Sequence, residues 1–185
     1  TDAVIRTIPV GGKPEFAVAD GQGHVYVNIE DTSEVLAIDA RELSIRSRWP
    51  VALCADPTGI SLDAKHHRLF VGCSNKLMAI VDADQGRLIT TLPVGAGCDA
   101  TAFDPQTNLA YSSNGDGTLT VVRENGPGRF VVADNVPTKV GARTMALDSP
   151  RQRIYLVTAA FGPRPAATPD QPRPRPQMVP GSFTL

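Results

Sequence analysis

One repeated position in the sequence collects polar side chains that are suited to holding a ligand. It lies five residues before each of four recurring aspartates and is occupied by Glu15, Thr58, Asp99 and Arg143. Two carboxylates and a guanidinium could hold a cation or a zwitterion, and the arginine could bind a carboxylate or phosphate through two hydrogen bonds. Alternatively, Asp99 and Arg143 pair with each other and stiffen the surrounding structure. The sequence therefore predicts a ligand-binding group here and leaves internal pairing as the alternative.

These positions belong to a segment that occurs four times in the chain. Each copy ends on an aspartate, and the spacings between successive aspartates are 43, 41 and 44 residues for Asp20, Asp63, Asp104 and Asp148. A polar turn and a short β-rich run follow each aspartate, and two further strand-like runs separate the copies. Four strands in a period of about 43 residues are typical of a propeller blade. We therefore expect an all-β fold, in which residues 1–185 form a single β-propeller, or a propeller fragment, of four-stranded antiparallel blades.

The composition is that of a folded chain. Of the 185 residues, 42% are hydrophobic and 20% are charged, which excludes a disordered protein. The net charge of −1 gives no general attraction to nucleic acid or to an anionic membrane. No stretch approaches the roughly 20 apolar residues that cross a bilayer, so we expect no membrane span.

Short motifs in the repeats resemble those of a known family. Degenerate forms of a Tyr-Val-Thr-Asn run occur at 26–28, 70–75 and 155–158, and the links at 8–14 and 92–97 share an apolar-Pro-Val-Gly core. In these features residues 1 to about 162 resemble the YVTN-repeat β-propellers, which are bacterial relatives of WD40-like domains. The resemblance implies an exported protein of the periplasm or cell exterior, with a poorly defined role.

The number of repeats leaves the closure of the ring open. Members of that family usually have seven blades, whereas this sequence holds three complete blades, an interrupted fourth and one further strand expected at Val4 to Val10. The chain could be a piece of a longer propeller. Alternatively, residues 4–10 supply the outer strand of the fourth blade and close a four-bladed ring, or two copies form a homodimer that completes an eight-bladed ring.

A proline-rich stretch interrupts the last repeat at residues 163–180. Proline removes ladder donors and favours an extended chain, so we expect an exposed excursion within the last blade, followed by a strand at 181–185. A recognition arm is the alternative. Arg164, Arg173 and Arg175 in this stretch raise a weaker hypothesis of single-stranded nucleic-acid binding.

Loops after the second strand of each repeat should lie on the same rim as the four polar positions. The expected rim-loop residues are Asn28, Asn75, Asn114 and Asp116, with Glu30, Asp31 and Lys76 beside them. Oxygen-rich side chains around a channel would suit calcium, which takes six to eight oxygen ligands. Residues 114–117, however, also have the composition of a tight hairpin.

The three cysteines should lie on this side of the ring as well. Cys54 precedes the first strand of its repeat and Cys73 follows the second strand, so antiparallel pairing would bring them together. A disulfide between them would imply an oxidising compartment and would leave Cys98 as a free thiol. Two reduced, buried cysteines are the alternative.

The scarce histidines argue against catalysis at the rim. His24, His66 and His67 fall in turns on the opposite face, and neither Ser112 nor Ser113 has a histidine partner in reach. We therefore expect a non-catalytic binding or scaffold protein, without a cofactor, that contacts a small ligand or a protein at the loop rim. The alternative is a metal-dependent hydrolase of the lactonase kind, with Glu15 and Asp99 as metal ligands.

Overall fold

The computed structural model describes residues 3–172 and 174–185, and its regular structure is almost entirely antiparallel β. Three sheets have four strands each, which we term blades 1, 2 and 3 in chain order. Blade 1 contains β1 (Pro14–Ala19), β2 (His24–Ile29), β3 (Glu34–Asp39) and β4 (Ser44–Pro50). Blade 2 contains β5 (Pro57–Asp63), β6 (Arg68–Cys73), β7 (Leu77–Asp82) and β8 (Leu88–Pro93). Blade 3 contains β9 (Cys98–Asp104), β10 (Leu109–Asn114), β11 (Thr118–Glu124) and β12 (Phe130–Pro137).

The fourth sheet, blade 4, has two strands. They are β13 (Thr144–Asp148) and β14 (Arg153–Val157), joined by a short 3-10 turn at Ser149–Arg151. Within each complete blade the strands follow one another in chain order, as short hairpins require. The predicted all-β fold of antiparallel four-stranded blades is therefore confirmed for the first three repeats.

The recurring aspartates fix the first turn of each blade. Asp20 accepts backbone N–H groups of Gln22 and His24 at 2.7 and 2.9 Å, and Asp63 accepts that of Lys65 at 3.1 Å. An aspartate that binds the backbone two residues ahead builds an Asx turn, which reverses the chain tightly. This local chemistry explains why the repeat ends on aspartate.

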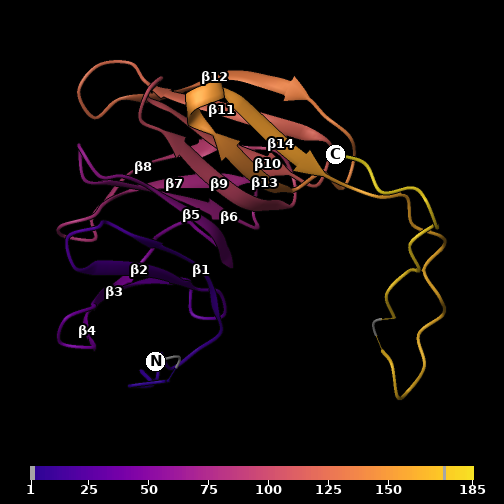
Figure 1. Ribbon diagram of the computed structural model, residues 1–185, viewed down its shortest axis with the longest axis horizontal. Coiled ribbons are helices and arrows are strands. Elements are labelled where there is room, and N and C mark those ends of the chain that lie inside the picture. The colour runs from indigo at the N-terminus through magenta and orange to yellow at the C-terminus, as the bar shows by residue number, and fades with distance from the viewer. Residues whose placement is uncertain (1–2, 173) are drawn as a thin grey trace.

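The blades are arranged side by side through their first strands. β1 packs beside β5, β5 beside β9, and β9 beside β13, as Figure 1 shows for the progression from indigo to orange. These four inner strands are the equivalent edges that a propeller places around its axis. In the described residues β1 and β13 lie at opposite ends of the array (Figure 1).

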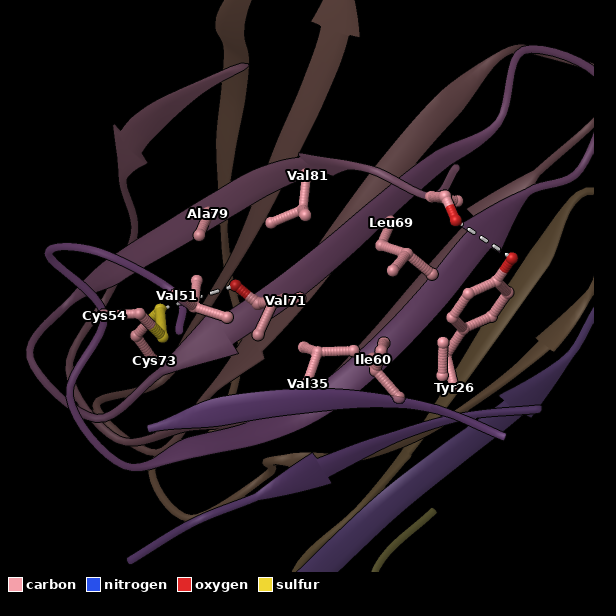
Figure 2. Packing of buried hydrophobic residues seen from close by; sticks show 12 residues of the cluster. Tyr26, Val35, Val51, Cys54, Ile60, Leu69, Val71, Cys73, Ala79 and Val81 are labelled. Atoms are coloured by element: carbon pink, nitrogen blue, oxygen red, sulfur yellow. Dashed lines mark hydrogen bonds between the residues drawn. A yellow bond between two sulfur atoms is a disulfide. The ribbon is translucent and has the colours of Figure 1, made fainter. Parts of the chain in front are cut away.

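Apolar side chains fill the spaces between neighbouring blades. Figure 2 shows the cluster between blades 1 and 2, where Leu69 and Val71 of β6 are fully buried against Val35 of β3. A second cluster, with Phe70, Met78 and Val122 among its members, joins blades 2 and 3. Complete burial of each large aliphatic side chain contributes about 1.5–3 kcal/mol, so these inter-blade layers hold the array together.

The expected strand at Val4 to Val10 is not formed. Residues 3–10 have no strand assignment, and Ile8 and Val10 pack against Ile29 and Leu36 on the face of blade 1 that points away from blade 2. Arg48 donates a hydrogen bond to the Val10 carbonyl and so holds the segment there. This segment therefore packs on blade 1 and does not complete the fourth blade.

The proline-rich excursion is exposed over residues 163–172, but the strand expected after it is missing. Residues 163–172 lie in the solvent-exposed arm at the right of Figure 1. In place of a strand at 181–185, the chain makes two isolated bridges, Thr158 to Thr184 and Phe161 to Met178. Both bridges lie beyond Val157, the last residue of β14, so the returning chain does not pair along that strand. Arg173 lies outside the described residues.

Candidate functional site

The four predicted ligand residues do come to one end of the inner strands. Glu15 and Thr58 are the second residues of β1 and β5, Asp99 is the second residue of β9, and Arg143 directly precedes β13. Because these strands pack in the order β1, β5, β9 and β13, the four residues form a row that crosses all four blades. We call this end of the array the rim.

Glu15 is already occupied by a cation from its own blade. The Lys13 ammonium lies 2.9 Å from a Glu15 carboxylate oxygen and also contacts Glu30. Lys13 lowers the pKa of Glu15, and the two carboxylates raise the pKa of Lys13 above its usual value. Sequence reasoning did not single out Lys13, although its position two residues before Glu15 was visible in the chain.

Asp99 and Arg143 form a loose ion pair between blades 3 and 4. The nearest N to O distance is 3.7 Å, and the Arg143 side chain is 57% exposed. The Arg143 carbonyl accepts a hydrogen bond from Ser113, so its backbone is fixed while its guanidinium faces solvent. The pairing anticipated as the alternative is thus present, but it leaves most of the five guanidinium donors unused.

Thr58 points into the protein. Its hydroxyl donates to the carbonyl of Cys98 at 3.0 Å, which ties β5 to β9. A hydroxyl used in this way strengthens the contact between blades 2 and 3.

Two of the predicted rim-loop residues act as clamps on the links between blades. Asp116 accepts the Ala96 N–H at 2.6 Å, and Asn75 accepts the Ala55 N–H at 3.2 Å. In blade 1 the equivalent Asp31 accepts the Lys13 N–H at 2.7 Å. The same side-chain oxygen therefore fastens the segment before the inner strand in three successive blades.

The other two rim-loop residues are buried, contrary to their expected place in exposed loops. Asn28 ends in the layer between blades 1 and 2, where its amide donates to the carbonyls of Thr58 and Gly59 at 2.7 and 3.0 Å. Asn114 donates to the hydroxyls of Thr118 and Thr120, each at 3.0 Å. Both residues lie within strands, and their amide N–H groups bind neighbouring backbone or hydroxyl oxygens, whereas Asn28 Oδ1 is buried without a hydrogen-bond partner.

Cys54 and Cys73 are joined by a disulfide at the same end of blade 2 (Figure 2). Both sulfurs belong to the apolar layer between blades 1 and 2. Cys98 is a free, buried thiol, and burial raises its pKa to about 11. It therefore remains protonated at neutral pH and is a poor nucleophile.

The histidines lie on the opposite face, as their turns predict. His24 and His66 bind the turn aspartates Asp20 and Asp63 through Nδ1, at 2.7 and 2.6 Å, and His67 binds Asp84 at 2.8 Å. Each imidazole thus holds a turn. They are separated from the rim by the length of the strands.

Metal-binding geometry is missing from the part of the chain that the structure describes. Among residues 3–172 and 174–185, no group of three or more His, Cys, Asp or Glu side chains could hold a metal ion. The hypothesis of a calcium or hydrolase site at Glu15 and Asp99 stays a prediction from the sequence.

Sequence reasoning missed a large hollow in the described residues. It has a volume of about 630 Å³, lies between blades 2 and 3 on the face opposite the rim, and has Phe70, Phe103 and Phe130 in its lining. The three phenylalanines occupy different positions of their repeats, so their convergence depends on how the blades pack.

Comparison with known proteins shows the fold. A chain of Kuenenia stuttgartiensis hydrazine synthase is similar to this one with a TM-score of 0.71 and 15% identity, over 88% of this chain and 46% of that chain. A chain of the mitotic checkpoint complex is similar with a TM-score of 0.62 and 19% identity, over 75% of this chain and 43% of that chain. Both are propeller folds of the WD40 type, and this chain spans less than half the length of each.

The sequence comparisons give no family. No family model and no curated protein matches the chain. The resemblance to YVTN repeats therefore stays a prediction, whereas the propeller-like fold stands on the structure. No helix within the described residues is both long and apolar enough to span a membrane.

Proposed function

We propose that the chain is a non-catalytic propeller module that binds a partner protein at the rim. The observation that carries this proposal is the half-exposed Arg143 guanidinium, which is held by a fixed backbone beside Asp99. Such a group can exchange its loose intramolecular pair for a carboxylate of a partner at little cost, because an exposed ion pair is worth only about 0–1 kcal/mol. Arginine on a rigid frame is also common in the energetic centres of interfaces.

The disulfide supports a place for this module outside the cytoplasm. A bond between Cys54 and Cys73 persists in an oxidising compartment such as the periplasm or the cell exterior. Export of the protein, as in the YVTN-repeat propellers that the sequence resembles, fits this chemistry. Cell fractionation of the tagged protein, together with thiol labelling of Cys54 and Cys73, tests the localisation.

The same strand offers a matched control for the binding test. Arg143 precedes β13 at the rim, and Arg151 follows β13 at the opposite end, where it pairs with Asp148 at 3.1 Å. Immobilised wild type, Arg143→Ala and Arg151→Ala would be incubated with an extracytoplasmic extract, and retained proteins would be quantified by mass spectrometry. A protein retained by wild type and Arg151→Ala but depleted at least fivefold on Arg143→Ala supports the proposal. Equal retention by all three baits, or retention no higher than on blank resin, would overturn it.

A further inference from the structure

The repeat places a cleft at the same position between successive blades, on the face opposite the rim. The cleft between blades 1 and 2 is lined by Asp20 and Tyr26, and that between blades 2 and 3 by their repeat equivalents Asp63 and Phe70. Their volumes differ, at about 170 Å³ for the first and about 630 Å³ for the second. The two clefts can therefore be compared residue by residue.

An indole ring lines and narrows the first cleft. Trp49 of β4 stacks with Tyr26 at 6.1 Å between ring centroids and a 26° interplanar angle. Its other contact is Gly86 in the turn between β7 and β8, where an added Cβ would overlap the indole ring. Gly86 has φ +68°, so the bare backbone of a left-handed glycine makes room for the ring.

The second cleft has a glycine at the equivalent position, but no aromatic ring lies over it. Gly128, in the turn between β11 and β12, has φ +67°, and nothing lies within 4 Å of a Cβ built on it. In β8 the position of Trp49 is taken by Leu92, since Trp49 pairs with Val35 and Leu92 with the equivalent Met78. The second cleft thus has the glycine turn that accommodates an indole ring in the first cleft, but it has no tryptophan.

The walls of the open cleft are aromatic. Phe70 and Phe103 stack at 5.4 Å with an 8° interplanar angle, and Phe70 meets Phe130 edge to face at 6.0 Å and 82°. Phe70 is buried against the other two rings, whereas the half-buried Phe103 and Phe130 offer apolar surface for a further flat ring. The volume is within the roughly 300–1,000 Å³ typical of small-molecule sites.

Two basic side chains of this cleft, Lys65 and Arg68, keep donors that stay unused in the described part of the chain. Asp63 already accepts from His66 at 2.6 Å, and Glu124 accepts the Gly128 N–H at 2.6 Å. By contrast, Lys65 has no ion pair within the described residues, and Arg68, which pairs with Asp82 at 3.6 Å, keeps its Nε buried without a hydrogen-bond partner. A buried donor without a partner costs about 1–3 kcal/mol, which an acceptor on a ligand would recover.

We propose that the cleft between blades 2 and 3 binds a small planar aromatic carboxylate. The ring lies over Gly128 and against the half-buried phenylalanines, as Trp49 lies over Gly86 in the neighbouring cleft. The carboxylate faces Lys65 and Arg68. This site is on the opposite face from the rim and does not depend on the function proposed there.

Titration calorimetry with indole-3-acetate as the probe tests the site. Two control compounds separate its parts: indole-3-ethanol has the ring without the carboxylate, and acetate has the carboxylate without the ring. We expect indole-3-acetate to bind the wild type at least tenfold more tightly than either fragment. Lys65→Ala should weaken that binding about fivefold, because it removes an exposed charge pair worth about 1 kcal/mol. Gln22→Ala, at the equivalent position of the first cleft, should leave it unchanged, as should Arg143→Ala at the rim.

Two variants that fill the cleft complete the test. Leu92→Trp restores the missing indole, and Gly128→Asn places a side chain over the bare backbone at a φ that asparagine tolerates. Either folded variant should lose binding of indole-3-acetate. Absence of binding to the wild type at millimolar probe would overturn the proposal, and so would undiminished binding to a folded variant of either kind.

Discussion

The disulfide between Cys54 and Cys73 should contribute about 3 kcal/mol to the free energy of unfolding. The two cysteines are separated by 19 residues, and closing a loop of about 20 residues restricts the unfolded chain by that amount in the chain-entropy description. Reduction removes this restriction without deleting any buried atom. The folded array should therefore survive reduction but become markedly easier to unfold.

Urea unfolding measures this effect directly. Trp49 is the only tryptophan of the chain and lies between blades 1 and 2, so its fluorescence reports on the layer that contains the disulfide. With a slope of about 2 kcal/mol/M, a loss of about 3 kcal/mol shifts the midpoint down by about 1.5 M. The measurement is made with and without a phosphine reductant.

A double variant separates the crosslink from other effects of the reductant. Cys54→Ala with Cys73→Ala should unfold near the midpoint of the reduced wild type and should not respond to reductant. Cys98 is retained throughout, because its buried thiol, with a pKa raised to about 11, takes little part in exchange. A difference below about 1 kcal/mol between oxidised and reduced wild type would refute the reasoning from loop closure.

Three further variants test the packing and the turns. Gly72→Ala should lower stability by about 1–3 kcal/mol, because its Cβ would overlap the Cys98 sulfur, and adding Cys98→Ala should recover part of the loss in the same urea assay. Tyr26→Phe should cost about 1 kcal/mol, since the Tyr26 hydroxyl donates to the Ala83 carbonyl at 3.2 Å; an unchanged melting temperature would contradict this. Although burial acts to raise it, hydrogen bonds from the backbone N–H groups of the turn lower the pKa of Asp20 to about 2. Between about pH 4 and pH 2 the unfolded chain takes up this proton before the folded chain does, so the free energy of unfolding of the wild type should fall by up to about 2 kcal/mol. Asp20→Asn should show a weaker dependence of stability on pH in this range when denaturation is followed by circular dichroism.

The sequence could predict the blades because their signals are local. Asp20 and Asp63 bind the backbone two or more residues ahead, so the residues that form each turn are adjacent in the sequence to the strands that the turn joins. Alternation within strands and the 43-residue spacing then fix four-stranded units. The common end of the inner strands, with Glu15 and Asp99, followed from the same periodicity.

What the sequence could not predict depends on contacts between repeats. Asn28 and Asp116 both follow a second strand or lie at its end, yet one is buried against blade 2 and the other clamps a link. Residues 4–10 have the composition of a strand, but a strand needs a partner edge, and the chain offers apolar surface on blade 1 instead.

The pattern of residues alone determined the kind of unit and its number of copies, because hydrogen bonding within a hairpin depends on neighbours in the chain. Tertiary packing alone decided which positions of neighbouring blades meet. Trp49 and Leu92 occupy the same position of the repeat and differ in the sequence, but that this position of β4 faces Gly86 of the next blade depends on how the blades pack. The physical reason is that the packing in a cleft depends on two facing surfaces, and each of these surfaces comes from a different repeat.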